Sequence, residues 1–547
     1  MKSKRLTLSV LFVVAAVANA LACTNLIVGK NASADGSTIV SYSADSYGLF
    51  GELYHYPAGM HKKGTLIDIH EWDTGKYLGQ IAQARQTYNV IGNMNEFQLT
   101  IGETTFGGRP ELVDTTGIID YGSLIYLGLQ RSRTAREAIK VMTELVQEYG
   151  YYSGGESFTI ADPNEIWIME MIGKGPGVRG AVWVAVRVPD DCISAHANQS
   201  RIHQFNMNDK ENCMYSPDVI SFAREKGYFD GVNKDFSFAN AYAPLDFGAR
   251  RYCEARVWSY FNMFTDRGNE FLPYILGETN TPMPLFVKPN RKVSVQDVKN
   301  AMRDHYEGTP LDISKDFGAG PYHTPYRLSP LSFKVGDREY FNERPISTQQ
   351  SGFVFVAQMR SELPDPIGGV LWFGTDDANM TVFTPVYCCT DKVPVCYTRV
   401  DGADYITFSW NSAFWIFNWV ANMVYPRYDL MIDDVRATQT ELETTFNEAQ
   451  EGVEAAAAKL LEKDPAKAKA FLTNYTNMTA QSTFDTWKRL GEFLVVKYND
   501  GVVKRMKNGQ FERNSIGQPA GVIRPGYPKE FLEEYVKQTG DRYKMPE

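Results

Sequence analysis

The feature that most constrains this chain is a cysteine placed directly after a short apolar leader. Residues 1–5 carry three positive charges, residues 6–17 form an apolar run, and Ala20-Leu21-Ala22 precedes Cys23. This is the pattern of a secretory signal peptide with an Ala-x-Ala cleavage site, and the run is too short for a transmembrane helix. We therefore expect residues 1–22 to be a signal peptide, and the protein to be exported to the periplasm or the extracellular space.

Cleavage after Ala22 would make Cys23 the first residue of the mature chain, with both a thiol and a free α-amine. An N-terminal amine can act as the base for its own side-chain nucleophile without a distant histidine. The reference pKa values are about 7.7–8.0 for the amine and about 8.5 for the thiol, so proton exchange between them costs little. The pair predicts a hydrolase that is inactive until it is cut.

Two other fates of this terminus remain open. Ala18-Asn19-Ala20 is a second Ala-x-Ala site, and cleavage there would leave Leu21 first. In a lipoprotein, Cys23 would be acylated and would anchor a binding protein instead of acting as a nucleophile. That signal usually has leucine three residues before the cysteine, where Ala20 stands here. The mass of the mature N-terminus distinguishes these outcomes.

The charge balance limits the partners of this protein. The 547-residue chain has a formal net charge of −9, and the leader holds three of its positive charges. An acidic chain argues against nucleic acid or an anionic membrane surface as the main partner. No later apolar run is long enough to span a bilayer, so we expect no stable membrane insertion. The hydrophobic content of 44% is enough for one large domain with an addition.

Neither a metal nor a cofactor is expected. The seven histidines are scattered and form no HExxH motif. Gly175, Gly177 and Gly180 have the spacing of a dinucleotide fingerprint, but a strand is expected after them where that motif requires a helix. Six cysteines besides Cys23 permit disulfides in an exported protein, although buried free thiols are an equally good interpretation. These are Cys192, Cys213, Cys253, Cys388, Cys389 and Cys396.

The residues after Cys23 predict a β-hairpin. Residues 24–28 have strand character, Asp35-Gly36 is a turn signal, and residues 37–43 resume strand character. If the turn centres on Ser33, Cys23 lies opposite about Ser43, and if it centres on Asp35-Gly36, Cys23 lies opposite about Gly48. Asp45 falls between these limits, so its carboxylate is expected near the amine or the thiol.

The segment CTNLIVGKNASADGSTIVSYSADS resembles the start of the cysteine-type N-terminal nucleophile hydrolases. It is most similar to the dipeptidases of the dipeptidase A type, with secernins, bile salt hydrolases and penicillin V acylases as more distant relatives. The shared pattern is an initial Cys-Thr, an Asp-Gly-Ser-Thr turn and a following Asp. The resemblance extends to about Val435. It implies an α+β fold, a four-layer αββα sandwich of antiparallel sheets, and short peptides as substrates.

The same resemblance implies the site residues. Asn198 matches an asparagine that binds the oxyanion or orients the substrate, and Arg256 matches an arginine near the site. Thr105 stands where the acylases have a second oxyanion asparagine, so a backbone amide is expected to serve there. Asn95 and Glu103, from a segment like the family's second strand pair, are further candidates for substrate binding.

One departure from the family pattern concerns charge. The acylases and many dipeptidases carry an arginine three residues before the aspartate that matches Asp45, but Tyr42 occupies that position here. A tyrosine supplies no permanent positive charge. Stabilisation of the Cys23 thiolate is therefore expected from its own amine or from another cation.

The chain is predicted to divide into the leader 1–22, a catalytic domain 23–435 and a helical C-terminal extension 436–547 packed on that domain. Within the catalytic part, apolar spacing predicts a helix over residues 135–149 that Gly150 ends. In the extension, a long helix is expected from Thr440 to Leu461. Asp464-Pro465 interrupts it, and helices over 466–475 and 482–498 follow.

The sequence thus predicts an exported cysteine dipeptidase with short peptides as its partners. An amidase that acts on N-acyl amino acids or conjugated bile salts is the nearest alternative within the hydrolases, and an apolar pocket in place of a carboxylate for a free amine would favour it. A lipid-anchored binding protein is the alternative outside the enzymes. The family resemblance also raises the expectation of a homo-oligomer.

Overall fold

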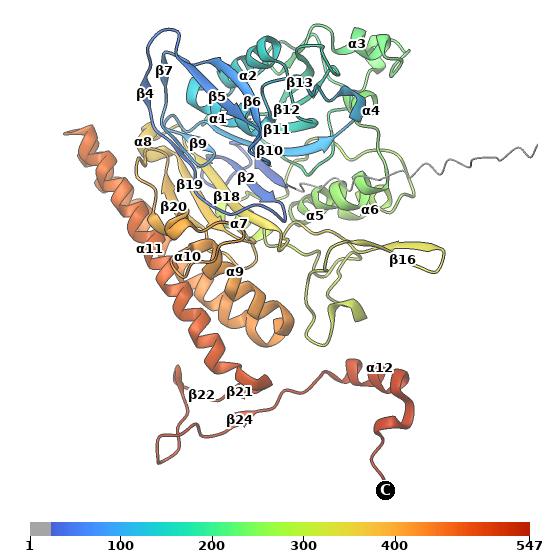
Figure 1. Ribbon diagram of the computed structural model, residues 1–547, viewed down its shortest axis with the longest axis vertical. Helices are drawn as coiled ribbons and strands as arrows, with labels where there is room; N and C mark the ends of the chain where they lie inside the picture. The colour runs from blue at the N-terminus through green and yellow to red at the C-terminus, as the bar shows by residue number, and fades with distance from the viewer. Residues whose placement is uncertain (1–22) are drawn as a thin grey trace, which may run out of the picture.

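Two antiparallel β-sheets form the centre of the protein in a computed structural model that describes residues 23–547 (Figure 1). The expected signal peptide and its cleavage site lie at residues 1–22, outside the described residues. No helix in the part of the chain from Cys23 onward combines the length and the apolar character needed to cross a membrane.

The first sheet carries the start of the described chain. All of its neighbouring strands are antiparallel, and Asn25, the first residue of β1, pairs with His196 at the end of β14. Its six strands, in spatial order, are β14 (Ile193–His196), β1 (Asn25–Val28), β2 (Thr38–Asp45), β18 (Ser351–Met359), β19 (Val370–Thr375) and β20 (Thr384–Tyr387).

The second sheet is larger and faces the first. Its central strands β11 and β12 are buried along their whole length and β10 along most of it, because the first sheet covers one face and helices cover the other. Its eight strands, in spatial order, are β15 (Cys213–Tyr215), β13 (Ala181–Arg187), β12 (Ile166–Gly173), β11 (Gly155–Ala161), β10 (Thr100–Gly107), β9 (Met94–Asn95), β8 (Val90–Ile91) and β3 (His55–Tyr56).

Helices cover both outer faces and complete four layers, which confirms the predicted α+β sandwich (Figure 1). On the eight-stranded sheet lie α1 (Tyr121–Arg131) and α2 (Ala135–Tyr149). On the six-stranded sheet lie α5 (Ala255–Phe264), α7 (Val295–Ala301), α9 (Ala413–Val424), α10 (Tyr428–Leu461) and α11 (Pro465–Lys497).

The sequence signals for α2 are confirmed. The Thr134 side chain caps the helix by accepting a hydrogen bond from the backbone N–H of Glu137. Gly150 ends it with φ of +79°, a backbone conformation that favours glycine. Its apolar face packs against the sheet through Ile139, Met142 and other buried residues.

The peripheral elements are short. Two-stranded sheets pair β4 (Gly59–Met60) with β7 (Gln86–Thr87), β5 (Leu66–His70) with β6 (Tyr77–Ala82), β16 (Ser332–Val335) with β17 (Arg338–Phe341), β21 (Val503–Lys504) with β24 (Val522–Ile523), and β22 (Met506–Lys507) with β23 (Gln510–Phe511). The connections also contain α3 (Val219–Glu225), α4 (Phe238–Tyr242), α6 (Gly268–Ile275), α8 (Asp365–Gly368) and α12 (Lys529–Thr539).

The C-terminal helices differ from their predicted bounds. The helix expected from Thr440 begins at Tyr428, and the break expected between residues 475 and 482 is absent because α11 is continuous. Thr476, Thr479 and Ala480 are buried in the break region, so packing against neighbouring elements offsets its weak helix propensity. After α11 the chain continues as an extended arm that ends in α12 (Figure 1).

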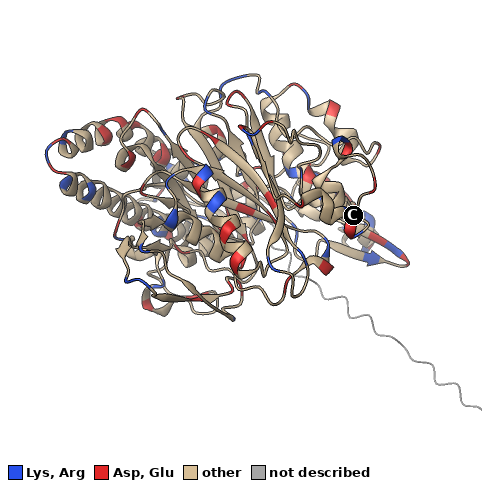
Figure 2. Cartoon of the chain, turned by 90° about the horizontal axis from the view of Figure 1, so that it is seen from above, with Lys and Arg blue, Asp and Glu red and all other residues tan. Residues whose placement is uncertain are grey.

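Charged residues lie mainly on the outer helices and loops (Figure 2). The strands between them are largely uncharged, as expected for layers that are buried on both faces. The exceptions are therefore informative, because a buried carboxylate needs a specific partner. Asp45, Glu103, Glu156 and Glu170 are such exceptions, each at most 1% exposed.

Candidate active site

The hairpin register places Cys23 beside the end of β2. Thr24 forms a bridge with Ser43, and the backbone N–H of Ser43 donates to the Thr24 carbonyl at 3.0 Å. This register confirms the turn position close to Ser33 and excludes the one centred on Asp35-Gly36. Cys23 therefore lies directly before β1 and close to Asp45, and its side chain is buried.

The Cys23 thiol lies in surroundings that disfavour its ionisation. Burial raises its pKa well above the ordinary range, and the nearby carboxyl groups of Glu103 and Asp45 raise it further. The backbone of Asp45 and the Tyr42 hydroxyl, 3.7 Å from Sγ, hydrogen-bond to the sulfur and act in the opposite direction. Because burial is the largest effect, this thiol needs a base in direct contact to become a nucleophile.

A hydrogen-bonded network connects the thiol to two buried carboxyl groups. The Tyr42 hydroxyl that contacts Cys23 also lies 2.6 Å from Oε1 of Glu103, to which it donates. Burial raises the pKa of Glu103 to about 7, while burial and the charge of Glu103 raise the pKa of Glu156 well above its usual range. The Thr105 hydroxyl donates to Glu156 at 2.7 Å. Glu103 also hydrogen-bonds to Glu156, so two of the predicted residues, Glu103 and Thr105, belong to one network beside Cys23.

Asp45 is held by an arginine that the sequence did not indicate. Arg344 forms a buried ion pair with Oδ2 of Asp45, and the hydroxyls of Ser351 and Ser43 donate to the same carboxylate at 2.5 and 3.1 Å. Tyr42 in place of the family arginine led to the expectation that the amine of Cys23 or another cation stabilises the thiolate, and Arg344 is a cation near the site that is paired with Asp45. No local signal marks it, since it lies in a loop about 300 residues from Asp45 in the sequence.

Arg256 joins Cys23 to the predicted oxyanion residue. Its Nη1 donates to the Cys23 carbonyl at 2.6 Å and to the Thr24 hydroxyl at 2.8 Å, and its Nη2 donates to Oδ1 of Asn198 at 2.9 Å. Burial and the charge of Arg344 lower its pKa to about 10, so it stays protonated at neutral pH. It lies in the first turn of α5, directly after the π-helical turn Ala249–Glu254, an irregularity that often occurs at functional sites.

Asn198 follows β14 in a left-handed conformation with φ of +62°. Its Nδ2 donates to the Thr105 carbonyl at 2.8 Å, and its Oδ1 accepts from Arg256. These two contacts hold the amide group in one orientation at the edge between the sheets. Non-glycine residues adopt this backbone conformation rarely, and they concentrate at functional sites.

Asn95 is not part of this cluster. Its Nδ2 donates to the carbonyls of Leu129 and Ser132, and its Oδ1 accepts from the backbone N–H groups of Phe97 and Leu99. All of these contacts are structural, because they connect the turn after β9 to the end of α1. We therefore assign Asn95 a role in stability and not in substrate binding.

Replacing Asn95 by alanine is expected to lower the free energy of unfolding by about 2–4 kcal/mol, because buried backbone groups lose their partners. The folded fraction should keep the kcat/KM of the unchanged protein. Urea denaturation and steady-state kinetics measure the two quantities, and Asn447→Ala on the exposed face of α10 is the matched control. A raised KM with unchanged stability would contradict the structural assignment.

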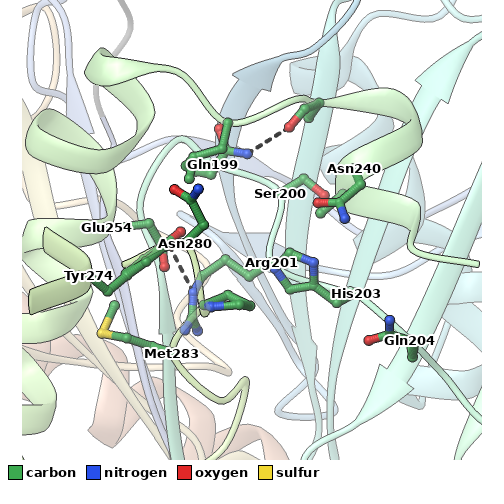
Figure 3. A pocket seen from close by; sticks show the side chains of 14 residues that line it. Gln199, Ser200, Arg201, His203, Gln204, Asn240, Glu254, Tyr274, Asn280 and Met283 are labelled. Carbon is green, nitrogen blue, oxygen red and sulfur yellow. Dashed lines mark hydrogen bonds and ion pairs between the residues drawn. The ribbon is translucent and has the colours of Figure 1, made fainter. Parts of the chain in front are cut away.

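A cavity of about 170 Å³ adjoins Asn198 along the chain (Figure 3). Its wall contains a buried ion pair in which Nε of Arg201 lies 2.9 Å from Oε1 of Glu254, two residues before Arg256. Gln199 donates to the Ala243 carbonyl at 2.9 Å. The charges of Arg201 and Glu254 neutralise one another, so this pair gives the cavity no net charge.

The described histidines and cysteines form no metal centre. No group of three or more His, Cys, Asp or Glu side chains among residues 23–547 could hold a metal ion. Both ring nitrogens of His196 are occupied by the hydroxyls of Thr104 and Thr159, at 2.7 and 2.6 Å, and burial lowers its pKa to about 3. The seven cysteines of this part of the chain are all free thiols, and all but Cys253 are buried, which agrees with the buried-thiol interpretation.

Comparison with known proteins adds evidence from outside the chain. The sequence model of the family described as "Peptidase family C69" matches residues 22–55 and 50–441. A probable dipeptidase of Salmonella dublin is 30% identical over 395 residues, which cover 67% of this chain and 81% of the relative. A probable dipeptidase of Latilactobacillus sakei is 26% identical, with 74% and 82% covered, and Dipeptidase A of Lactobacillus helveticus is 24% identical, with 72% and 80% covered.

The family match and the antiparallel sandwich together define a peptide-bond hydrolase. The match covers well over half of the chain, and the Salmonella relative shares 30% identity across two thirds of it. This protein belongs to peptidase family C69.

Proposed function

We propose that this protein is an exported dipeptidase whose nucleophile is Cys23 and whose general base is the α-amine of the same residue. The observation that carries the proposal is the carboxylate of Glu103, which is separated from the thiol only by the Tyr42 hydroxyl. A dipeptide places its charged amino group next to the scissile carbonyl, so a carboxylate at this position can hold that amino group while the thiol attacks. The dipeptidases among the relatives are consistent with this substrate class.

In the first half of the reaction, the α-amine takes the thiol proton and the thiolate forms a bond to the carbonyl carbon. The tetrahedral oxyanion is stabilised by Asn198 and a backbone N–H. The carbon–nitrogen bond then breaks, and the protonated amine returns the proton to the leaving nitrogen. In the second half, water attacks the thioester, the amine takes a proton from that water, and the acid leaves as the thiol is restored.

The high pKa of the buried thiol supports an internal base. Without a proton acceptor in contact, a thiol in this position stays protonated at neutral pH. The α-amine exists only after cleavage at Ala22, so the precursor would lack the base. We infer that Asp45, fixed by Arg344, holds the amine in position. We also infer that 23–435 is the catalytic unit and 436–547 an extension packed on it.

The two alternatives fit the site less well. An amidase for N-acylated substrates would need an apolar pocket at the position that Glu103 and Tyr42 occupy. A lipid anchor on Cys23 would have to extend from a side chain that is only 3% exposed. Both alternatives are tested by the same measurement, which compares free dipeptides with their N-acetylated forms on protein whose mature N-terminal mass is known.

Replacing Glu103 by glutamine is expected to raise KM for dipeptides by about 10–100-fold with a smaller effect on kcat, because a hydrogen bond to a charged group is lost. The Tyr42 contact is retained, since glutamine still offers an oxygen acceptor. In the unchanged protein, KM should fall as pH rises through about 7, where Glu103 becomes ionised. The variant should lack this dependence.

Glu448→Gln, an exposed change on α10, is the matched control for that experiment. Equal hydrolysis of free and N-acetylated dipeptides would refute recognition of the amine. Hydrolysis of N-acetylated substrates alone would replace the dipeptidase proposal by the amidase.

A further inference from the structure

A second cavity, of about 250 Å³, combines aromatic rings with buried carboxyl groups. Its walls include Tyr47, Tyr326, Tyr405, Tyr425, Asp376 and Asp377, together with the side-chain amides of neighbouring residues. The two aspartates follow β19 directly, and Tyr425 follows α9. The proposed chemistry at Cys23 does not use this cavity.

The carboxyl group of Asp376 has an incomplete set of partners. Its Oδ1 accepts from Nδ2 of Asn418 at 3.1 Å, but its buried Oδ2 has no hydrogen-bond partner in the described structure. Asp376 has φ of +66° and is 1% exposed. No lysine or arginine between residues 23 and 547 forms an ion pair with Asp376 or Asp377. A buried carboxyl group without a counter-ion is costly, so this arrangement points to a ligand.

By contrast, both carboxylate oxygens of Asp377 accept hydrogen bonds. The hydroxyl of Ser347 and the backbone N–H of Asn379 donate to its Oδ1 at 2.9 and 2.6 Å, and the Tyr425 hydroxyl donates to its Oδ2. Burial and the neighbouring Asp377 raise the pKa of Asp376 well above its usual range. A cation in the cavity would remove this repulsion.

The aromatic rings determine which kind of cation fits. Tyr326 and Tyr425 meet edge to face, with ring centroids 4.4 Å apart, inside the cavity wall. Tyr47 and Tyr405 also line the cavity and are 46% and 38% exposed, so they provide its rim. Aromatic faces attract organic ammonium and guanidinium groups. The cavity has only two carboxyl groups, and no group of three or more His, Cys, Asp or Glu side chains among residues 23–547 could hold a metal ion.

The cavity is physically connected to the catalytic carboxylate. Tyr47 lies two residues after Asp45 in the chain. The loop 344–351 carries Arg344 and Ser351, which bind Asp45, and also Ser347, which binds Asp377. A ligand in the cavity would therefore lie next to Tyr47, which follows Asp45 in the chain, and next to the loop whose Arg344 and Ser351 bind Asp45.

We propose that this cavity is a binding site for an alkylammonium or alkylguanidinium group, with Asp376 as its counter-ion. The group has two possible sources of the same chemistry: the basic side chain of a peptide held at Cys23, or a separate small amine. Binding itself goes beyond the proposed function and does not depend on hydrolysis. Only the first source rests on the dipeptidase proposal.

The direct test is isothermal titration calorimetry on the full mature chain carrying Cys23→Ala, at pH 7.5. The probe is n-butylamine, which is a cation at this pH, and n-butanol is the neutral probe of the same length. We expect one site for butylammonium and none for butanol. Asp376→Asn should weaken binding by about tenfold or more, and Tyr405→Ala by about threefold. The exposed control Asp337→Asn should bind like the parent.

Absence of butylammonium binding to the parent protein would overturn the proposal. Equal binding of butanol would do so as well, and so would equal affinity in the Asp376→Asn and parent proteins. Tyr405 lies at the rim, so its variant keeps the test valid if Asp376→Asn does not fold.

A kinetic comparison then identifies the source. With Cys23 present, kcat/KM is measured for a lysine-containing dipeptide and for its norleucine analogue. A loss confined to the lysine substrate in Asp376→Asn assigns the site to the substrate side chain. An equal effect on both substrates, with non-competitive action of butylammonium, assigns it to a separate amine. If neither dipeptide is hydrolysed, the dipeptidase proposal fails while the calorimetric result still decides the binding site.

Discussion

Replacing Cys23 by alanine is expected to lower kcat/KM for dipeptides by a factor of about 10⁴ or more, because the only atom proposed to bond to the substrate is removed. The melting temperature should change by only a few degrees, since the rest of the site keeps its hydrogen bonds through backbone atoms of residue 23. Hydrolysis of a dipeptide by purified mature protein, with thermal unfolding in parallel, measures both effects.

The matched control is Cys192→Ala, which removes another buried thiol outside the cluster and should leave activity intact.

A second variant tests the base directly. A mature chain that retains Ala22 keeps the thiol but converts the α-amine into an amide, so it should be as inactive as the alanine variant. Full activity in Cys23→Ala would mean that the nucleophile is a different group. Full activity in the chain that retains Ala22 would mean that the base is a different group.

Replacing Arg256 by lysine is expected to lower kcat by about 10²–10³-fold, the scale seen when one oxyanion donor is lost. Lysine keeps the positive charge but not the planar set of donors that contacts both the Cys23 carbonyl and Asn198. The free energy of unfolding should also fall by about 2–4 kcal/mol, because several buried carbonyl and hydroxyl groups lose a donor. Steady-state kinetics and urea denaturation measure the two effects.

Arg256 acts through Asn198 in this interpretation, so the two should be coupled. Asn198→Ala alone should reduce kcat, and adding Arg256→Lys should reduce it by less than the product of the single effects. Arg267→Lys, an exposed change in a helical ion pair, is the control. Independent, multiplicative effects would show that Arg256 does not position Asn198.

The charges around Cys23 explain why these residues act together. Glu103 and Asp45 oppose formation of a thiolate, and Arg344 and Arg256 lie among the same buried groups. Such a site is close to electrically balanced before substrate binds. A substrate ammonium group can therefore interact with Glu103 without first displacing a protein cation from it, since the described partner of its Oε1 is the neutral Tyr42 hydroxyl.

Local sequence signals predicted the local structure near Cys23. The turn and strand signals after Cys23 placed Asp45 within reach, and the register places it there. The resemblance to N-terminal nucleophile hydrolases pointed to Asn198, Arg256, Glu103 and Thr105. In the folded chain Arg256 bonds to Cys23 and Asn198, and Asn198 bonds to the Thr105 carbonyl. Glu103 accepts from the Tyr42 hydroxyl, which contacts Cys23. The register of a hairpin depends on residues close together in the sequence, which explains why the position of Asp45 could be predicted.

The roles of Asn95 and Arg344 depend on contacts with residues far away in the sequence, so they could not be predicted from the sequence. Asn95 was a candidate for substrate binding, but its position in a turn next to the end of α1 uses its whole amide group. Arg344 carried no sequence signal, because its importance comes from pairing with Asp45 across the sheet. Ion pairs between residues so far apart arise only when strands β2 and β18 are brought side by side.

The sequence alone determined a cysteine after a short apolar run, an acidic overall charge, and strands with enough apolar residues for buried sheets. These properties follow from residue type and spacing, which act over a few residues. The tertiary structure alone decided which polar and charged groups meet beside Cys23: Tyr42 with Glu103, Asp45 with Arg344, and Arg256 with Asn198. The physical reason is that a polar or charged group buried between two sheets is stable only when it has a hydrogen-bonding or charged partner. The fold determines which group is that partner.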